Sequence, residues 1–141
     1  MNNTPGNNNI LIIGSDTCYL EKVEIFLNSI LTRAEIDRTK FKRLLLCVSE
    51  GVLNAVIHGN KNKVEKLVRI ETELDDKEIL VTIKDEGDGF NFNEIPNPTI
   101  NENLKKEKGR GLHIIRTYAD EVKFENKGSV LKIKFNLRAE D

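Results

Sequence analysis

The sequence lacks tryptophan, has only two cysteines, and concentrates two of its three prolines in one segment, residues 86–108. Cys18 and Cys47 have no cysteine or histidine nearby at metal-ligand spacing, so we exclude a zinc site and expect two reduced packing residues. No apolar run approaches the roughly 20 residues of a membrane helix. The asparagine-rich start has neither the basic nor the apolar part of an export signal. These absences predict a cytoplasmic protein that does not enter a membrane.

An excess of charge is also absent, because 22 basic and 23 acidic residues leave a net charge of -1. Nucleic-acid binding depends on neutralising several phosphates with lysine and arginine, so we expect no direct nucleic-acid partner. A length of 141 residues suits one domain. We therefore expect a disordered tail over residues 1–9 and one folded domain over residues 10–138.

Hydrophobic periodicity predicts a short strand at residues 10–14 and two amphipathic helices at 17–31 and 37–58. Ser15 and Asp16 are both candidate caps of the first helix. Alternating β-branched residues predict a hairpin of strands at 66–74 and 78–85, and two more strands at 121–124 and 129–137. A short helix is expected at 111–118. Segment 86–108 is rich in turn residues, so we expect no regular element there beyond one turn of helix. Because loops this long are often lids, we expect residues 91–108 to form a lid.

The second predicted helix carries polar residues in an apolar surround. Glu50, Asn54 and His58 lie four residues apart on one flank. The side opposite the main apolar stripe is also apolar, since it carries Leu46, Leu53 and Ile57. The helix is therefore predicted to be buried on two faces. Desolvated polar groups need partners. They either hydrogen-bond within the core, which is the commoner case, or form an oxygen-rich patch that can hold Mg²⁺.

A second candidate site follows directly after a predicted strand, at Asp85-Glu86-Gly87-Asp88-Gly89-Phe90. Two glycines one residue apart let the backbone approach a ligand closely. The alternative is a hairpin turn, because Asp-Gly is a favoured turn dipeptide. That alternative is weakened because residues 91–98 do not resume an alternating strand.

The third candidate site, Lys108-Gly109-Arg110-Gly111-Leu112, is expected to open a helix. Free N–H groups at a helix N-terminus, together with basic side chains, form an anion site. Taken alone the segment is an ordinary solvated basic loop. The sequence contains neither a dinucleotide-binding fingerprint nor a Walker A motif.

In their order along the chain these three sites resemble the nucleotide-binding boxes of the GHKL ATPase superfamily, which has the Bergerat fold of gyrase and of sensor histidine kinases. Residues 49–60 resemble the first box, residues 85–90 the second, and residues 109–112 with Ile114-Ile115 the glycine-rich third. Within the superfamily, the chain is most similar to anti-sigma-factor serine/threonine kinases. The resemblance implies an α/β two-layer sandwich, with helices on one face of a mixed, largely antiparallel sheet.

The resemblance also implies roles for individual residues, with ATP and Mg²⁺ as cofactors. Glu50 would be the catalytic base, Asn54 a magnesium ligand, and Asp85 the acceptor of the adenine amino group. The remaining residues would hold the nucleotide: Gly87 and Gly89 beside the base, and Lys108, Gly109, Arg110, Gly111 and Leu112 around the phosphates. One departure is Glu107, which occupies about the place where some such kinases carry an arginine.

The partners implied are a sigma factor and a small anti-anti-sigma-type antagonist that carries the target serine. A non-catalytic protein that uses ATP only to shape a sigma-binding surface is the alternative, and dimerisation is left open. The catalytic half of a histidine kinase would need a preceding phosphoacceptor domain, and only residues 1–9 precede the first strand. We expect His58 to be a structural hydrogen-bonding residue and His113 to lie on a helix surface. A clamp or chaperone ATPase would need a following transducer domain.

Overall fold

The computed structural model describes residues 7–32, 34, 36–87 and 102–138, with the backbone alone for Asn7 and for residues 102–108. Within these residues the chain forms five strands, β1 (Asn7–Gly14), β2 (Leu67–Leu74), β3 (Glu78–Lys84), β4 (Glu121–Glu125) and β5 (Val130–Asn136). It also forms three α-helices, α1 (Leu20–Leu31), α2 (Arg38–Leu53) and α3 (Glu102–Tyr118). Shorter helical segments are η1 (Thr17–Tyr19), η2 (Asn54–Gly59) and η3 (Asn126–Gly128).

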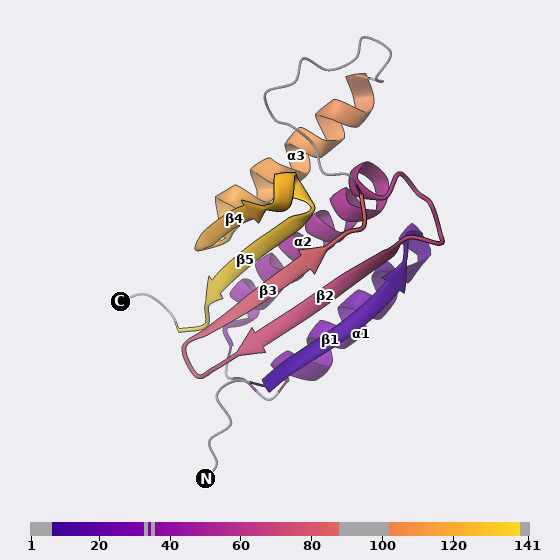
Figure 1. Ribbon diagram of the computed structural model, residues 1–141. Coiled ribbons are helices and arrows are strands. Elements are labelled where there is room, and N and C mark those ends of the chain that lie inside the picture. Colours follow the sequence, from indigo (N-terminus) through magenta and orange to yellow (C-terminus); the bar gives the residue numbers. More distant parts are fainter. Residues whose placement is uncertain (1–6, 33, 35, 88–101, 139–141) are drawn as a thin grey trace.

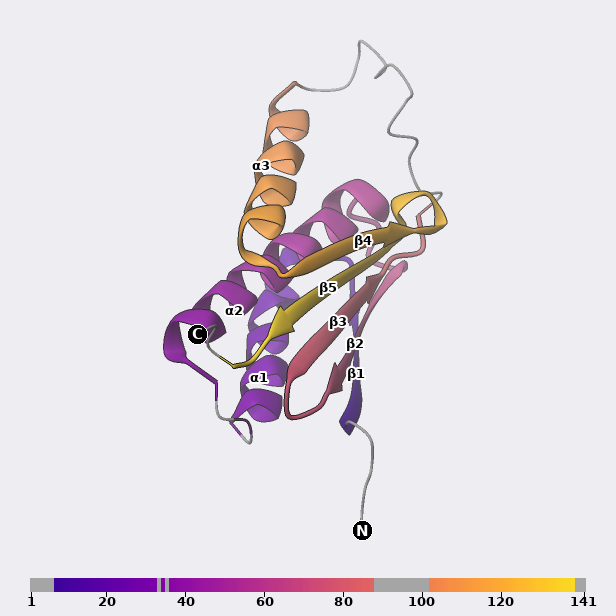
Figure 2. The same ribbon diagram turned by 90° about the vertical axis from the view of Figure 1, so that its left-hand side faces the viewer.

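The strands form one sheet in the order β1-β2-β3-β5-β4, and every pair in the described part of the chain is antiparallel. The predicted hairpin is β2 and β3, which pair from Arg69 opposite Lys84 to Leu74 opposite Ile79. Helices α1 and α2 cover one face of this sheet (Figures 1 and 2). The predicted two-layer α/β fold is therefore confirmed, with a wholly antiparallel sheet among the described residues.

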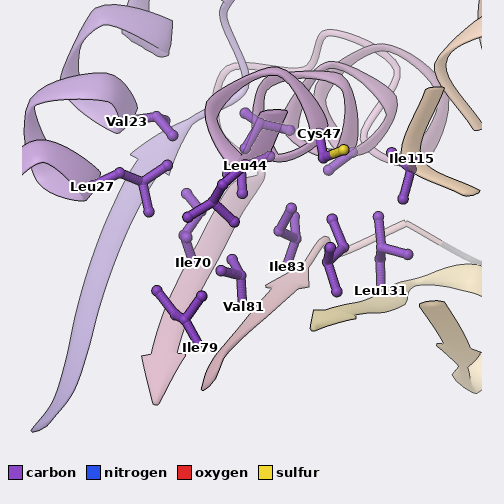
Figure 3. Close-up of a cluster of buried hydrophobic side chains, with 14 of the residues drawn as sticks. Val23, Leu27, Leu44, Cys47, Ile70, Ile79, Val81, Ile83, Ile115 and Leu131 are labelled. Atoms are coloured by element: carbon purple, nitrogen blue, oxygen red, sulfur yellow. The ribbon is translucent and has the colours of Figure 1, made fainter. Parts of the chain in front are cut away.

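The hydrophobic core fills the space between α1, α2 and the covered face of the sheet. Figure 3 shows side chains from both layers pointing toward one another, among them Val23, Leu27, Leu44, Cys47, Ile70, Val81, Ile83 and Leu131. Burying one such aliphatic side chain contributes roughly 1.5–3 kcal/mol. Along β2 the buried residues alternate with more exposed ones, as expected of a strand with one covered face. This packing fixes α2, and with it the candidate site, against the sheet.

The N-termini of the first two helices follow local capping rules. Asp16, one of the two candidate caps, accepts a hydrogen bond from the Cys18 N–H at 2.9 Å at the start of η1. Asp37 accepts from the Lys40 N–H at 3.3 Å and begins α2. A side-chain oxygen at the cap position satisfies a backbone donor that the helix leaves unpaired. The predicted helix over 37–58 is thus confirmed, as α2 continued by η2.

Two predicted boundaries were wrong. Asn7–Asn9, expected in the tail, belong to β1, where Asn7 pairs with Leu74 of β2. The third helix begins at Glu102 instead of Gly111, so residues 102–108 of the expected lid are helical. Glu, Leu and Lys are strong helix formers and dominate residues 102–108, whereas each glycine costs only about 1 kcal/mol inside a helix. Residues 91–101 of the expected lid lie outside the described residues.

Burial also corrects two predictions. Cys47 is buried in the core as expected, but Cys18 is exposed and is not a packing residue. Leu46 is 41% exposed, and Leu53 and Ile57 are only half-buried, so the second apolar face of α2 is not enclosed. In the part of the chain that the structure describes, no helix combines the length and the apolar character needed to cross a membrane.

Candidate functional site

The junction between α2 and η2 brings the first group of predicted site residues together. At Asn54 the α-helix changes to a π-helix, and the Asn54 backbone N–H is shared between the carbonyls of Glu50 and Gly51. Single π-helical turns inside α-helices often mark functional sites. The Nδ2 atom of Asn54 is buried and has no hydrogen-bond partner among the described residues. Because an unpaired buried amide costs about 1–3 kcal/mol, this atom indicates a site that a ligand completes.

A pocket opens on the sheet side of this junction. Its lining comes from α2, η2, the end of β3, α3 and the strands β4 and β5: Gly51, Asn54, Ala55, His58, Gly59, Ile83, Asp85, Leu112, Phe124, Gly128 and Leu131. Most of these residues are apolar or have no side chain, while Asp85 places a carboxylate in the wall. Such a lining suits a flat, largely apolar group that carries a hydrogen-bond donor.

Asp85 is held in place by the backbone around it. Its N–H donates to the Ser129 carbonyl at 2.9 Å, and its Oδ1 accepts from the Gly87 N–H at 2.8 Å. The loop lies so close to the end of η2 that a Cβ on Gly59 would overlap the Asp85 carboxylate. Similarly, a Cβ on Gly87 would overlap the Gly59 carbonyl group. The two glycines therefore permit the contact between this loop and η2 that places Asp85 in the pocket.

A second cavity, a cleft of about 350 Å³, lies between α2–η2 and α3. It is lined by Glu50, Leu53, Asn54, Ile57, His58, Arg110 and Ile114. Asn54 and His58 line both cavities and form the wall between them, whereas Asp85 lines only the pocket and Glu50 only the cleft. A ligand that extends from the pocket past Asn54 therefore reaches the cleft beside Glu50.

Helix α3 closes on this region through one of its glycines. A Cβ on Gly111 would lie 2.9 Å from Glu50 Oε2, whereas a Cβ on Gly109 would meet nothing within 4 Å. Gly111 thus lets α3 approach the Glu50 carboxylate. The two residues beside it diverge, because Arg110 lines the cleft and Leu112 lines the pocket.

The predicted helix start at Lys108-Gly109-Arg110-Gly111-Leu112 was wrong, and phosphate binding by this segment stays a prediction. Residues 109–112 lie inside α3, where backbone N–H groups are used by the helix itself. Gly89 and the side chain of Lys108 lie outside the described residues. His113 is exposed on the surface of α3, as predicted.

The thiol of Cys47, one turn before Glu50, is not a nucleophile. Burial, and to a lesser extent the nearby negative charge of Glu50, together raise the pKa of the Cys47 thiol to about 12. Its Sγ lies 3.8 Å from the Ile114 carbonyl oxygen. Cys47 therefore remains a protonated packing residue between α2 and α3.

Asn60 is the residue of this region whose role the sequence analysis missed, since it was included only as the last residue of the segment that resembles the first box. It is 1% exposed, and its side chain hydrogen-bonds to three different segments. An asparagine after a glycine is common where a helix ends. The sequence therefore offers no signal that distinguishes an asparagine linking several segments from one that only ends a helix.

A pocket with a carboxylate in a mainly apolar wall, joined at Asn54 to a cleft lined by Glu50 and Arg110, suits a ligand with a flat, largely apolar part and a charged part. Comparison with known families agrees, because residues 14–135 match the histidine kinase-like ATPase domain. The chain belongs to this family.

Named relatives are anti-sigma factors. The chain is 32% identical over 113 residues to an anti-sigma F factor of Clostridium beijerinckii, covering 74% of this chain and 79% of the relative. It is 34% identical over 108 residues to an anti-sigma F factor of a Geobacillus species, covering 72% and 74%. The matched family domain, residues 14–135, includes the α2–η2 region and the Asp85 loop.

A solved structure shares the fold. The crystal structure of the RsbU and RsbW domains of Rv1364c from Mycobacterium tuberculosis superposes with a TM-score of 0.64 at 16% identity, over 94% of this chain. The chain spans about a third of the length of that protein, 32%. At this identity the likeness shows the fold, which is that of the family.

Membership of an ATPase domain family implies ATP binding, and the described residues of the two cavities fit that ligand. Asn54 lines both cavities, and its Nδ2, a donor without a partner among the described residues, fits a ligand oxygen. Gly59 and Gly87 let the loop after β3 pack against η2, which places the Asp85 carboxylate in the pocket. Asp85 supplies the acceptor that an exocyclic amine requires.

Proposed function

We propose that this protein is a serine/threonine kinase of the anti-sigma-factor type, which binds Mg-ATP and phosphorylates a small antagonist protein in a partner-switching system. The observation that carries the proposal is the division of the site by Asn54. The pocket on one side contains Asp85, whose carboxylate is suited to binding a nucleotide base. The cleft on the other side contains Glu50, whose carboxylate is suited to catalysis. Phosphoryl transfer requires mainly positioning and charge neutralisation, which this arrangement supplies.

Each described residue takes one part of the work. Asp85 accepts a hydrogen bond from the adenine amino group, in the pocket that its backbone contacts fix. Asn54 offers its amide oxygen to Mg²⁺, which prefers oxygen ligands and neutralises phosphate charge when bound. Arg110 lines the cleft, and its positive charge would attract the phosphates of a nucleotide that extends into it. By the family resemblance, Gly89 and the segment from Lys108 to Leu112 also contact the nucleotide.

Glu50 acts as the base for the acceptor hydroxyl. As the serine oxygen forms its bond to the γ-phosphorus, its proton passes to the Glu50 carboxylate, and the bond from phosphorus to the ADP oxygen breaks. Gly111 holds α3 close to this carboxylate. Such positioned proton transfer contributes roughly 10²–10⁴-fold to a rate.

The partners follow from the relatives, which are named anti-sigma F factors. We propose a sigma factor as the sequestered protein and an anti-anti-sigma-type antagonist as the phosphorylated one. The alternative is a non-catalytic ATP-dependent protein that only sequesters its target. What supports it is that residues 109–112 lie inside α3, where their N–H groups are bonded within the helix and cannot position a phosphate for transfer.

The two functions are separated by a pair of variants measured with radiolabelled ATP and the serine-bearing antagonist. Glu50→Gln is expected to keep ATP affinity and to lower phosphotransfer by about 10²-fold or more. Asn54→Ala is expected to lower both Mg-ATP affinity and transfer, because it removes a link between protein and metal. Glu65→Gln, the same substitution at an exposed position, is the matched control and is expected to behave as the wild type.

Two results would contradict the kinase assignment. Full phosphotransfer by Glu50→Gln would remove Glu50 from the chemistry. Absence of transfer by the wild type to every antagonist encoded with it, combined with ATP-dependent binding of a sigma factor, would establish the sequestering function instead.

A further inference from the structure

Asn60 joins four segments that meet behind the pocket. Its side-chain Nδ2 donates to Ser15 Oγ at 2.8 Å and to the Leu67 carbonyl at 3.0 Å, so it contacts the segments at the end of β1 and the start of β2. Its Oδ1 accepts from the Glu86 N–H at 2.8 Å, in the loop after β3. Its own N–H donates to the Ala55 carbonyl at 2.8 Å and closes η2.

These partners fix the orientation of the Asn60 amide. A carbonyl oxygen can only accept and a backbone N–H can only donate, so Nδ2 must face Leu67 and Oδ1 must face Glu86. Ser15 Oγ passes the chain of hydrogen bonds on to the Lys66 carbonyl at 2.6 Å. Asn60 and Ser15 are each 1% exposed, so water does not compete for these bonds. In such surroundings a satisfied polar network specifies one arrangement of the groups it joins.

The bond from Glu86 to Asn60 sits next to the residue that carries base recognition. Asp85 is held by its own N–H, which donates to the Ser129 carbonyl, and by the next residue, whose N–H donates to Asn60. The Glu86 side chain adds a third restraint, because its Oε1 accepts from the Leu67 N–H. Among these three restraints, Asn60 is the one that ties the loop to the end of η2, the element that carries Asn54. It adds to the direct packing of Asp85 and Gly87 against Gly59.

We propose that Asn60 is a positioning residue for nucleotide selectivity: it sets the place of the Asp85 carboxylate relative to η2 and thereby its discrimination in favour of adenine. Asn60 itself does not line the pocket. The proposal rests on the ATP-binding part of the proposed function and on Asp85 as the acceptor of the adenine amine. It does not depend on phosphotransfer.

The readout is a ratio of affinities. ATP and purine riboside triphosphate differ only in the exocyclic amino group, so the ratio of their affinities reports the bond to Asp85. A hydrogen bond to a charged group corresponds to a preference of roughly 10- to 150-fold. Loss of overall stability leaves this ratio unchanged among the molecules that remain folded, whereas displacement of the carboxylate lowers it.

The experiment compares three proteins by calorimetric titration with the two nucleotides. Asn60→Ala removes the acceptor for Glu86, and we expect its ratio to fall at least about 5-fold, because a displaced carboxylate makes a poorer bond. Ser15→Ala removes a different partner of the same amide and leaves the Glu86 bond in place, so we expect the wild-type ratio. If Asn60→Ala does not fold, Asn60→Ser, which is polar but too short to reach Glu86, replaces it.

The outcomes separate this proposal from the proposed function. A wild-type protein that binds both nucleotides equally would remove Asp85 from adenine recognition and the present proposal with it. A wild type that prefers ATP, together with an Asn60 variant that loses affinity for both nucleotides by the same factor, overturns the positioning role alone. Loss of selectivity in both the Asn60 and the Ser15 variants also overturns it, because the effect would then belong to the network as a whole.

Discussion

Replacing Thr72 with valine should stabilise the fold, although threonine is common in strands. Thr72 lies in β2 on the covered face of the sheet, opposite Asn9 in β1 and Val81 in β3. The residue is 1% exposed, and its Oγ1 has no hydrogen-bond partner among the described residues. The hydroxyl therefore loses its bonds to water on folding and gains none in return.

The magnitude follows from this unpaired hydroxyl. A buried polar group without a partner costs about 1–3 kcal/mol, and valine replaces the hydroxyl with a methyl group of similar shape. We expect the free energy of unfolding to rise by about 1–2 kcal/mol, which for a chain of this size raises Tm by about 3–6 °C.

A control on the other face of the sheet isolates the effect. Thr82 in β3 is also poorly exposed, at 7%, but it pairs with Glu71 and Lys132 on the charged face. Thr82→Val exchanges the same atoms and changes strand propensity by the same amount, yet we expect little or no rise in the free energy of unfolding. Urea unfolding followed by circular dichroism measures both variants. A Thr72→Val protein no more stable than Thr82→Val would show that the Thr72 hydroxyl has a partner in solution and that the reasoning is wrong.

Three further predictions concern the site. Gly111→Ala should keep or raise stability, since alanine favours a helix by about 1 kcal/mol. The same substitution should lower phosphotransfer about 10-fold, because the added Cβ displaces Glu50. Phosphotransfer equal to that of the wild type would refute this contact. Gly87→Ala should weaken ATP binding, because its Cβ overlaps the end of η2; titration tests this. A thiol reagent should label Cys18 in the folded protein and Cys47 only after unfolding, and equal labelling would contradict the burial of Cys47.

Local patterns accounted for most of the fold. The periodicity of residues 37–58 predicted one continuous helical element, because apolar spacing directly reflects which side of a helix faces the core. The hairpin of β2 and β3 followed from alternation around a short polar turn. Asp75 at that turn accepts from the N–H groups of Lys77 and Glu78 at 2.7 and 2.8 Å, an ordinary use of aspartate in a turn.

The sequence by itself also selected the candidate site residues that the proposed function uses: Glu50 and Asn54 one helical turn apart, and Asp85 directly after a strand. Their types and spacing depend only on the local chain. The assignment of the glycine-rich segment to a helix start failed because the pattern weighed Gly109 and Gly111 as breaks, whereas helix formation sums over the whole stretch from Glu102.

Only the tertiary structure decided how these residues share a site. That Asn54 separates two cavities, that Gly111 faces Glu50, and that Asn60 holds the loop of Asp85 all depend on contacts between segments far apart in the sequence. Such contacts produce no periodic pattern in the sequence, because each involves a single residue whose neighbours along the chain do not take part. Close packing of η2, α3 and the sheet brings them together, and that packing is a property of the whole core.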